Sequence, residues 1–79
     1  MKIQLQYFSF FGDLCGKNSE TLNTNAKTAK DLYREIEKLY KFEKDPKNFR
    51  VAINDEFVDW DQVLQENDNV VFIPPVAGG

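Results

Sequence analysis

The last six residues of the sequence carry its clearest chemical signal. The chain closes with Pro74-Pro75-Val76-Ala77-Gly78-Gly79, which makes the Gly79 carboxylate a candidate reactive group. The two prolines fix φ and remove two backbone donors, so a preceding strand must stop there. The two glycines lack a Cβ that would clash with a surrounding wall. Fully extended, the segment reaches about 20 Å. This pattern predicts a narrow, uncharged arm with a carboxylate at its tip, and it disfavours the alternative of an inert frayed terminus.

A free α-carboxylate needs activation before it can form a new acyl bond or donate sulfur. Its pKa is about 3.3–3.7, so at neutral pH it is ionised and is neither a useful electrophile nor a sulfur donor. The rest of the chain holds no activating machinery. It has no His and one cysteine, which excludes catalytic triads, His-metal sites and thiolate clusters. Residues 12–18 superficially resemble a phosphate-binding loop, but only three residues separate the two glycines, and Asn18 replaces the Ser or Thr that would hold Mg²⁺.

The single cysteine, Cys15, could be a nucleophile or a sulfur donor. A cysteine that precedes a glycine at the edge of a loop is more often a small packing residue. We therefore expect a carrier that binds no metal and no cofactor of its own, and not a catalyst that acts alone.

Length and composition indicate one small folded domain. The chain has 79 residues, of which 42% are hydrophobic and 14% aromatic, far too apolar for a disordered chain. We expect a domain over residues 1–73 and a functional tail over 74–79. The sequence has no long apolar run and no signal-like N-terminus, so we expect neither a membrane span nor secretion. With one cysteine and no disulfide framework, a cytoplasmic location is expected.

Charge is distributed unevenly along the chain. The net charge is −3, yet residues 27–50 hold eight basic and five acidic side chains. After Asn54 there is no basic residue. The acidic residues of that part are Asp55, Glu56, Asp59, Asp61, Glu66 and Asp68. An acidic half that leads into the tail argues against nucleic acid and suits a protein partner with a basic docking surface.

The N-terminal third predicts a hairpin. Residues 2–8 alternate between apolar and polar side chains, with Ile3, Leu5 and Tyr7 on one face, which is typical of a half-buried strand. Residues 19–23 predict a weaker second strand. The intervening residues 9–18 contain two glycines and are expected to form a loop.

One helix is expected next. Thr28 and Asp31 have the spacing of a capping box, and Lys38 and Lys41 lie where the helix dipole favours cations. Asp45-Pro46 prevents the helix from continuing further. The apolar residues at helical spacing are Ala29, Leu32, Ile36, Leu39 and Tyr40.

Three further strands complete an α+β fold. They are expected at residues 49–53, 56–58 and 70–73, with a turn at Asn54-Asp55 between the first two. Trp60 and Leu64 lie in the connection to the last strand. The order β-β-α-β-β-β indicates a sheet with one main helix on one face.

These elements and the tail resemble a known family. Phe72-Ile73-Pro74-Pro75-Val76-Ala77-Gly78-Gly79 is similar, almost position for position, to the aromatic-apolar-Pro-Pro-Val-x-Gly-Gly ending of the small subunits of molybdopterin synthase. Those subunits have the ubiquitin-like β-grasp fold. Residues 5–8, 14–16, 28–32 and 67–68 also fit, so the resemblance covers essentially the whole chain.

The resemblance implies a role in molybdenum cofactor biosynthesis. An activating enzyme would use ATP to convert the Gly79 carboxylate to an acyl-adenylate, and sulfur would displace AMP to leave a thiocarboxylate. The large catalytic subunit would receive the tail, and the thiocarboxylate would donate sulfur to a pterin precursor in an assembly of two small and two large subunits. Gly78 and Gly79 would pass a narrow channel. Pro74, Pro75, Val76 and Ala77 would contact the partner as an extended segment held at low entropic cost.

Three apolar side chains are out of phase with the expected core. Phe8, Phe57 and Ile73 should point away from it. The β-grasp fold places the first and last strands side by side, so Phe8 and Ile73 should lie near the root of the tail. Exposed apolar patches usually mark interfaces, and the resemblance implies that these positions bind both the activating enzyme and the large subunit. Alternatively, Phe10 or Phe11 covers part of the patch.

Three other functions stay open. Sulfur carriers of thiamine or thiolation pathways share the Gly-Gly end, although thiamine carriers generally lack the two prolines. Ubiquitin-like modifiers commonly carry a basic residue before Gly-Gly, and this chain has none there. A non-catalytic β-grasp interaction module with an inert tail is the third alternative.

Overall fold

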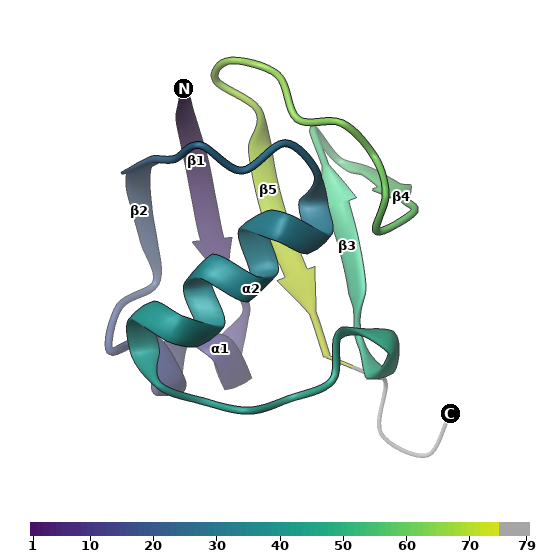
Figure 1. Cartoon of the computed structure of the whole chain (residues 1–79). Coiled ribbons are helices and arrows are strands. Elements are labelled where there is room, and N and C mark those ends of the chain that lie inside the picture. The colour runs from purple at the N-terminus through teal and green to yellow at the C-terminus, as the bar shows by residue number, and fades with distance from the viewer. Residues whose placement is uncertain (75–79) are drawn as a thin grey trace.

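The fold has two layers, a mixed sheet and a helix that crosses one of its faces (Figure 1). The computed structural model describes residues 1–74, with the side chains of Ser9 and Phe10 left out. The elements in chain order are β1 (Lys2–Tyr7), α1 (Ser9–Cys15), β2 (Ser19–Asn23), α2 (Ala29–Tyr40), the 3-10 turn η1 (Pro46–Asn48), β3 (Arg50–Ile53), β4 (Glu56–Val58) and β5 (Asn69–Ile73).

The sheet has the strand order β2-β1-β5-β3-β4. β1 and β5 are parallel neighbours, with Tyr7 opposite Phe72, and the other pairs are antiparallel. Because β1 and β5 run the same way, both end at the same edge of the molecule, where α1 and η1 lie (Figure 1). The α+β class and the expected strand and main-helix order are confirmed. No helix within residues 1–74 is long and apolar enough to cross a membrane.

Residues 9–18 do not form the expected loop. They contain the seven-residue helix α1, which ends at Gly16 with a left-handed φ of 74°. Phe11 and Cys15, one helical turn apart, are both buried, so α1 packs one side against the core. Because Gly12 and Gly16 are typical of turns, the spacing of Phe11 and Cys15 did not indicate a helix in the sequence. The expectation of a loop is therefore wrong, and Phe11 belongs to the core.

Helix α2 begins as the sequence predicts. Thr28 Oγ1 accepts a hydrogen bond from the Asp31 N–H at 3.2 Å, and Asp31 Oδ2 accepts one from the Thr28 N–H at 3.3 Å, which completes the capping box. The helix ends earlier than Asp45-Pro46 requires. Lys41 takes the left-handed conformation at φ 58° and caps α2, while Pro46 begins η1.

The buried stripe of α2 differs from the expected one at two positions. Leu32 and Ile36 are fully buried as predicted, but Leu39 is 51% exposed and Tyr33 is fully buried in its place. At about 100° per residue, Tyr33 and Tyr40 lie within about 40° of the Ala29 direction, whereas Leu39 lies about 80° away. The assignment of Leu39 to the core is therefore wrong.

Tyr33 is the centre of an aromatic cluster. Its hydroxyl donates to the Lys44 carbonyl at 2.6 Å. Five rings surround it with centroids 5.2 to 6.3 Å away, those of Phe11, Phe42, Phe49, Trp60 and Phe72. Phe72 is the last buried residue of β5. The cluster thus fixes, from the helix side, the strand end that leads to the tail.

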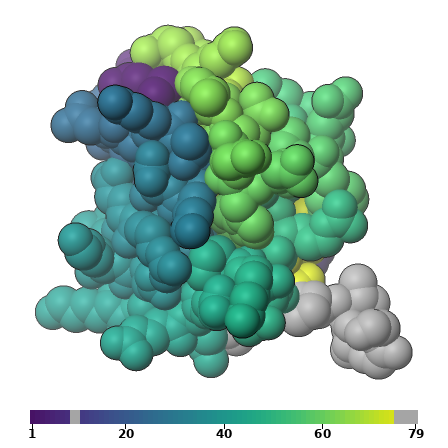
Figure 2. Space-filling model, turned by 45° about the vertical axis from the view of Figure 1, so that its right-hand side comes forward, coloured from purple at the N-terminus to yellow at the C-terminus, as the bar shows by residue number. Residues whose placement is uncertain are grey.

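The connection between β4 and β5 closes this side of the core. Residues 59–68, green in Figure 2, lie along the blue residues that lead into α2. Backbone hydrogen bonds join the two segments, from the Ala29 N–H to the Gln62 carbonyl at 3.0 Å and from the Leu64 N–H to the Lys27 carbonyl at 2.9 Å. The inner face of the sheet is therefore covered, and the opposite sheet face is left without a covering helix.

Replacing Leu32 or Ile36 with Ala is expected to lower the free energy of unfolding by about 2–5 kcal/mol, because each truncation leaves a cavity in a closed core. Leu39→Ala makes the same chemical change on an exposed side chain and should alter stability by less than about 0.5 kcal/mol. Urea unfolding of the variants measures these differences. Losses at Leu32 and Ile36 no larger than the loss at Leu39 would contradict this assignment of the buried face.

Candidate functional site

The sheet face opposite α2 carries an apolar patch next to the end of β5. In β5, Val70 and Phe72 point to the core, so Val71 and Ile73 point to the open face. Strand pairing extends this row across the sheet, because Val71 is opposite Ala52 and Ala52 is opposite Phe57. Phe8 follows β1 with extended backbone angles and continues the alternation past buried Tyr7. We call Phe8, Ala52, Phe57, Val71 and Ile73 the open-face patch.

The structure places the predicted docking residues as their strand phase requires. Phe8 is 55% exposed and Phe57 is 57% exposed, while Ile73 is partly exposed. Phe11 cannot cover the patch, because its side chain is fully buried on the helix side of the sheet. The contribution of these residues to partner binding stays a prediction.

β5 stops at the root of the tail. The ladder ends at Ile73, and Pro74, partly exposed, has no N–H with which to extend it. Residues 75–79 lie outside the described residues, so the roles expected for Pro75, Val76, Ala77, Gly78 and Gly79 stay predictions, as does the boundary between domain and tail. The described geometry shows that β5 ends at Ile73, beside the open-face patch.

A second group of polar side chains gathers on the other side of β1. The hydroxyls of Tyr7 and Tyr40 both donate to Glu20 Oε2, the latter at 2.5 Å, and Lys17 Nζ lies 3.5 Å from Glu20 Oε1. Burial raises the pKa of Tyr7, and its hydrogen bond to Glu20 raises it further. These contacts tie β1, β2 and α2 together through one carboxylate. The network therefore has a structural role.

Cys15 lies near this network but is not poised for chemistry. Its side chain is buried in the core cluster. Burial first, and then the nearby Glu20 carboxylate, raise the pKa of the thiol to about 11. Such a pKa favours the protonated thiol at neutral pH, which is a poorer nucleophile than the thiolate. The packing interpretation of Cys15 is confirmed.

Glu20→Gln is expected to lower the free energy of unfolding at neutral pH by about 1–3 kcal/mol, because two tyrosine hydroxyls lose an ionised acceptor. Burial alone would raise the pKa of Glu20, but hydrogen bonds from Tyr40 and Tyr7 and the charge of Lys17 outweigh it and lower the pKa. A depressed pKa stabilises the fold above the unfolded value of about 4.3, and this stability is lost as the pH falls through the folded value.

Denaturant unfolding from pH 7 to pH 3 tests this linkage. The parent protein should lose more stability on acidification than the Glu20→Gln variant, with the difference confined to the region below about pH 4.3. Glu43→Gln, at an exposed position, is the matched control and should follow the parent curve. Parallel curves for the parent and Glu20→Gln would show that Glu20 is not the responsible group.

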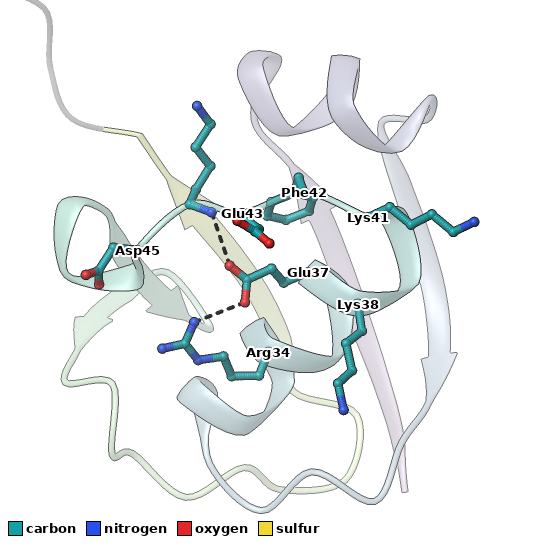
Figure 3. Close-up of a pocket in the computed structure, with 8 residues that line it drawn as sticks. Arg34, Glu37, Lys38, Lys41, Phe42, Glu43 and Asp45 are labelled. Atoms are coloured by element: carbon teal, nitrogen blue, oxygen red, sulfur yellow. Dashed lines mark hydrogen bonds and ion pairs between the residues drawn. The ribbon is translucent and has the colours of Figure 1, made fainter.

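None of the residues that line a hollow beside α2 belongs to the open-face patch. This hollow measures about 690 Å³ and lies beside the end of α2, as Figure 3 shows. Glu37 in its wall accepts hydrogen bonds from Arg34 Nη1 at 3.0 Å and from the Lys44 backbone N–H at 3.1 Å, and these fasten the turn after α2. Lys38 and Lys41 extend outward (Figure 3). Within residues 1–74, no three metal-binding side chains come together.

Comparison with known proteins assigns the chain to a family. The model of the ThiS family matches residues 5–79. The chain belongs to the ThiS family. A relative, the molybdopterin synthase sulfur carrier subunit of Homo sapiens, is 32% identical to it over 99% of this chain and 94% of the relative.

Solved structures share the fold. A putative molybdopterin converting factor, subunit 1, from Pyrococcus furiosus is 30% identical, with a TM-score of 0.78 over 96% of this chain and 99% of that one. A chain in the complex of subunits 1 and 2 of the molybdopterin-converting factor from Helicobacter pylori is 20% identical, with a TM-score of 0.69 over both full lengths. That likeness shows the fold alone. The resemblance to small subunits of molybdopterin synthase and the β-grasp fold are confirmed.

One open-face residue was not singled out from the sequence. Arg50 lies in β3 directly opposite Ile73, and its guanidinium carbon is 4.0 Å from the centroid of the Phe57 ring. Alternation with Val51 indicates that Arg50 points outward. Its proximity to Phe57 depends on the register of β3 against β4, which the local sequence does not reveal.

Proposed function

We propose that this ThiS-family chain is the sulfur carrier subunit of a molybdopterin synthase. The observation that carries the proposal is that an exposed apolar patch adjoins the strand end from which the Pro-Pro-Val-Ala-Gly-Gly segment continues. The 32% identity to the human sulfur carrier subunit over nearly the whole chain supports it. A docking face next to a narrow tail suits a protein that delivers its terminus into another enzyme.

In this proposal the reacting atoms belong to Gly79. Its carboxylate oxygen attacks ATP within an activating enzyme, pyrophosphate leaves, and an acyl-adenylate forms. A sulfur nucleophile then displaces AMP to give a thiocarboxylate. The chain itself binds no cofactor, since the activating enzyme binds ATP. The thiocarboxylate sulfur then attacks a pterin precursor in the active site of the large subunit, and water hydrolyses the acyl–sulfur bond, which leaves sulfur on the precursor and regenerates the Gly79 carboxylate.

The proposed partner is the large catalytic subunit of the synthase, in an assembly of two small and two large chains. A structure that pairs subunits 1 and 2 of the Helicobacter pylori factor supports this kind of partner. The open-face patch would be covered on binding, and the aromatic cluster beneath Phe72 would hold β5 still while the tail enters the partner. This chain would supply the sulfur and position it in the active site, and the large subunit would supply the catalytic groups.

Intact-mass analysis tests the proposal. The purified chain is incubated with a candidate activating enzyme, ATP and a sulfur source, and the expected result is the exchange of one oxygen for sulfur. Addition of the large subunit and the pterin precursor should return the chain to its original mass. A ladder of conjugates on lysines would instead indicate a protein modifier, and an unchanged mass an inert interaction module. A thiocarboxylate that no large subunit consumes would favour a carrier of another sulfur pathway.

A further inference from the structure

Arg50 is an exposed cation that adjoins the open-face patch through Phe57 and Ile73. Three other basic residues, Lys17, Arg34 and Lys47, each form an ion pair with a carboxylate. The guanidinium of Arg50 makes no ion pair with any described Asp or Glu. It lies over the Phe57 ring at 4.0 Å, and strand pairing places it directly beside Ile73 at the root of the tail.

The guanidinium carbon of Arg50 lies close enough to the Phe57 ring for a cation–π contact, and Arg50 is exposed. A guanidinium that rests flat on an aromatic ring uses its face, and its N–H groups remain at the edge of the plane. The ring also restricts the side chain, so less freedom is lost when a further contact forms. Phe57 therefore holds Arg50 at the edge of an apolar surface, beside the root of the tail, where its hydrogen-bond donors are available to a partner.

A partner that covers the patch must also satisfy this charge. A cation that loses its water without gaining an acceptor is strongly unfavourable, and a guanidinium matches a carboxylate through two parallel hydrogen bonds. Arginine in an interface is a frequent hot spot for the same reason. An apolar partner surface with no acid would leave Arg50 unpaired.

We propose that Arg50 is a specificity-determining residue that binds a carboxylate on the large subunit, at the edge of the apolar contact and beside the point where the tail enters. This inference rests on the proposed function, because it takes the open-face patch as the contact with that subunit. The acidic residues of 55–68 still favour a basic surrounding surface on the partner. The partner surface then carries one acidic side chain beside its apolar area and basic residues around it.

The test compares charge reversals at two neighbouring exposed positions. Arg50→Glu and Lys47→Glu make a similar change of charge, but Lys47 lies in η1 and pairs with Asp45 outside the patch. Calorimetric titration against the large subunit is expected to show an affinity loss of at least 100-fold for Arg50→Glu and less than about 5-fold for Lys47→Glu. Arg50→Lys should lose affinity to an intermediate extent, because it keeps the charge and loses the planar fork.

A charge-swap experiment identifies the partner group. Each acidic residue on the contact surface of the large subunit is replaced with Lys in turn, and one of these variants is expected to restore binding of Arg50→Glu. If Arg50→Glu melts below the parent, Arg50→Gln replaces it, with the same expected ranking. Equal losses for Arg50→Glu and Lys47→Glu, or unchanged binding of Arg50→Glu, would overturn the inference. Failure of the parent chain to bind the large subunit would instead contradict the proposed function.

Discussion

Deletion of Gly78 and Gly79 is expected to abolish sulfur transfer while the domain keeps its fold. The acyl group that would carry sulfur belongs to Gly79, and the shortened chain would end on a side chain too wide for the proposed channel. We expect the core to be independent of the deleted residues, since every core residue described lies at or before Phe72. A reconstituted assay with activating enzyme, large subunit and pterin precursor measures the transfer.

Thermal unfolding supplies the control for this deletion. The melting temperatures of the parent and shortened chains should agree, because no described core contact is lost. Continued pterin sulfuration by the shortened chain would remove the carrier hypothesis. A much lower melting temperature would show that the tail stabilises the domain, and the loss of activity would then have a structural cause.

Phe8→Glu is expected to separate folding from binding. Phe8 is 55% exposed, so a glutamate there keeps its water in the free chain and should change stability by less than about 0.5 kcal/mol. In the complex the same charge would be buried in an apolar contact without a partner. That penalty is several kcal/mol, which corresponds to a loss of affinity of two or more orders of magnitude.

Leu39→Glu is the matched control for this variant. Leu39 is 51% exposed, close to the exposure of Phe8, but it lies on α2 on the other side of the sheet. Calorimetric titration against the large subunit should therefore show unchanged affinity for Leu39→Glu and a large loss for Phe8→Glu. If the two variants bind equally well, the interface lies elsewhere. If Phe8→Glu does not fold, Phe8 contributes to the core and its strand phase is misassigned.

Local patterns in the sequence were sufficient to predict most of the helices and strands. Alternation predicted β1, and the β3–β4 turn at Asn54 and Asp55 has the positive φ values that a tight hairpin needs. The capping box located the start of α2. These features depend on residues a few positions apart, so the local sequence contains the necessary information. The tail motif likewise indicated the family that the comparisons confirmed.

Features stabilised by distant contacts could not be predicted in this way. α1 is short and contains Gly12, so it has little helical propensity of its own, and it forms where Phe11 packs against rings from α2, β5 and the loops around η1. Tyr33 replaced Leu39 in the core because the surrounding rings, and not helical spacing alone, select the buried face.

The features of the candidate site also divide into those that depend on local sequence and those that depend on distant contacts. The sequence by itself determined the tail, its proposed chemistry and the outward phase of Phe8, Phe57 and Ile73, because a strand alternates its side chains residue by residue. Only the tertiary structure decided that Arg50 lies on Phe57 and beside Ile73. That arrangement depends on the register of three strands joined by a turn and a long connection. Register is set by the burial of whole strand faces and not by any short segment.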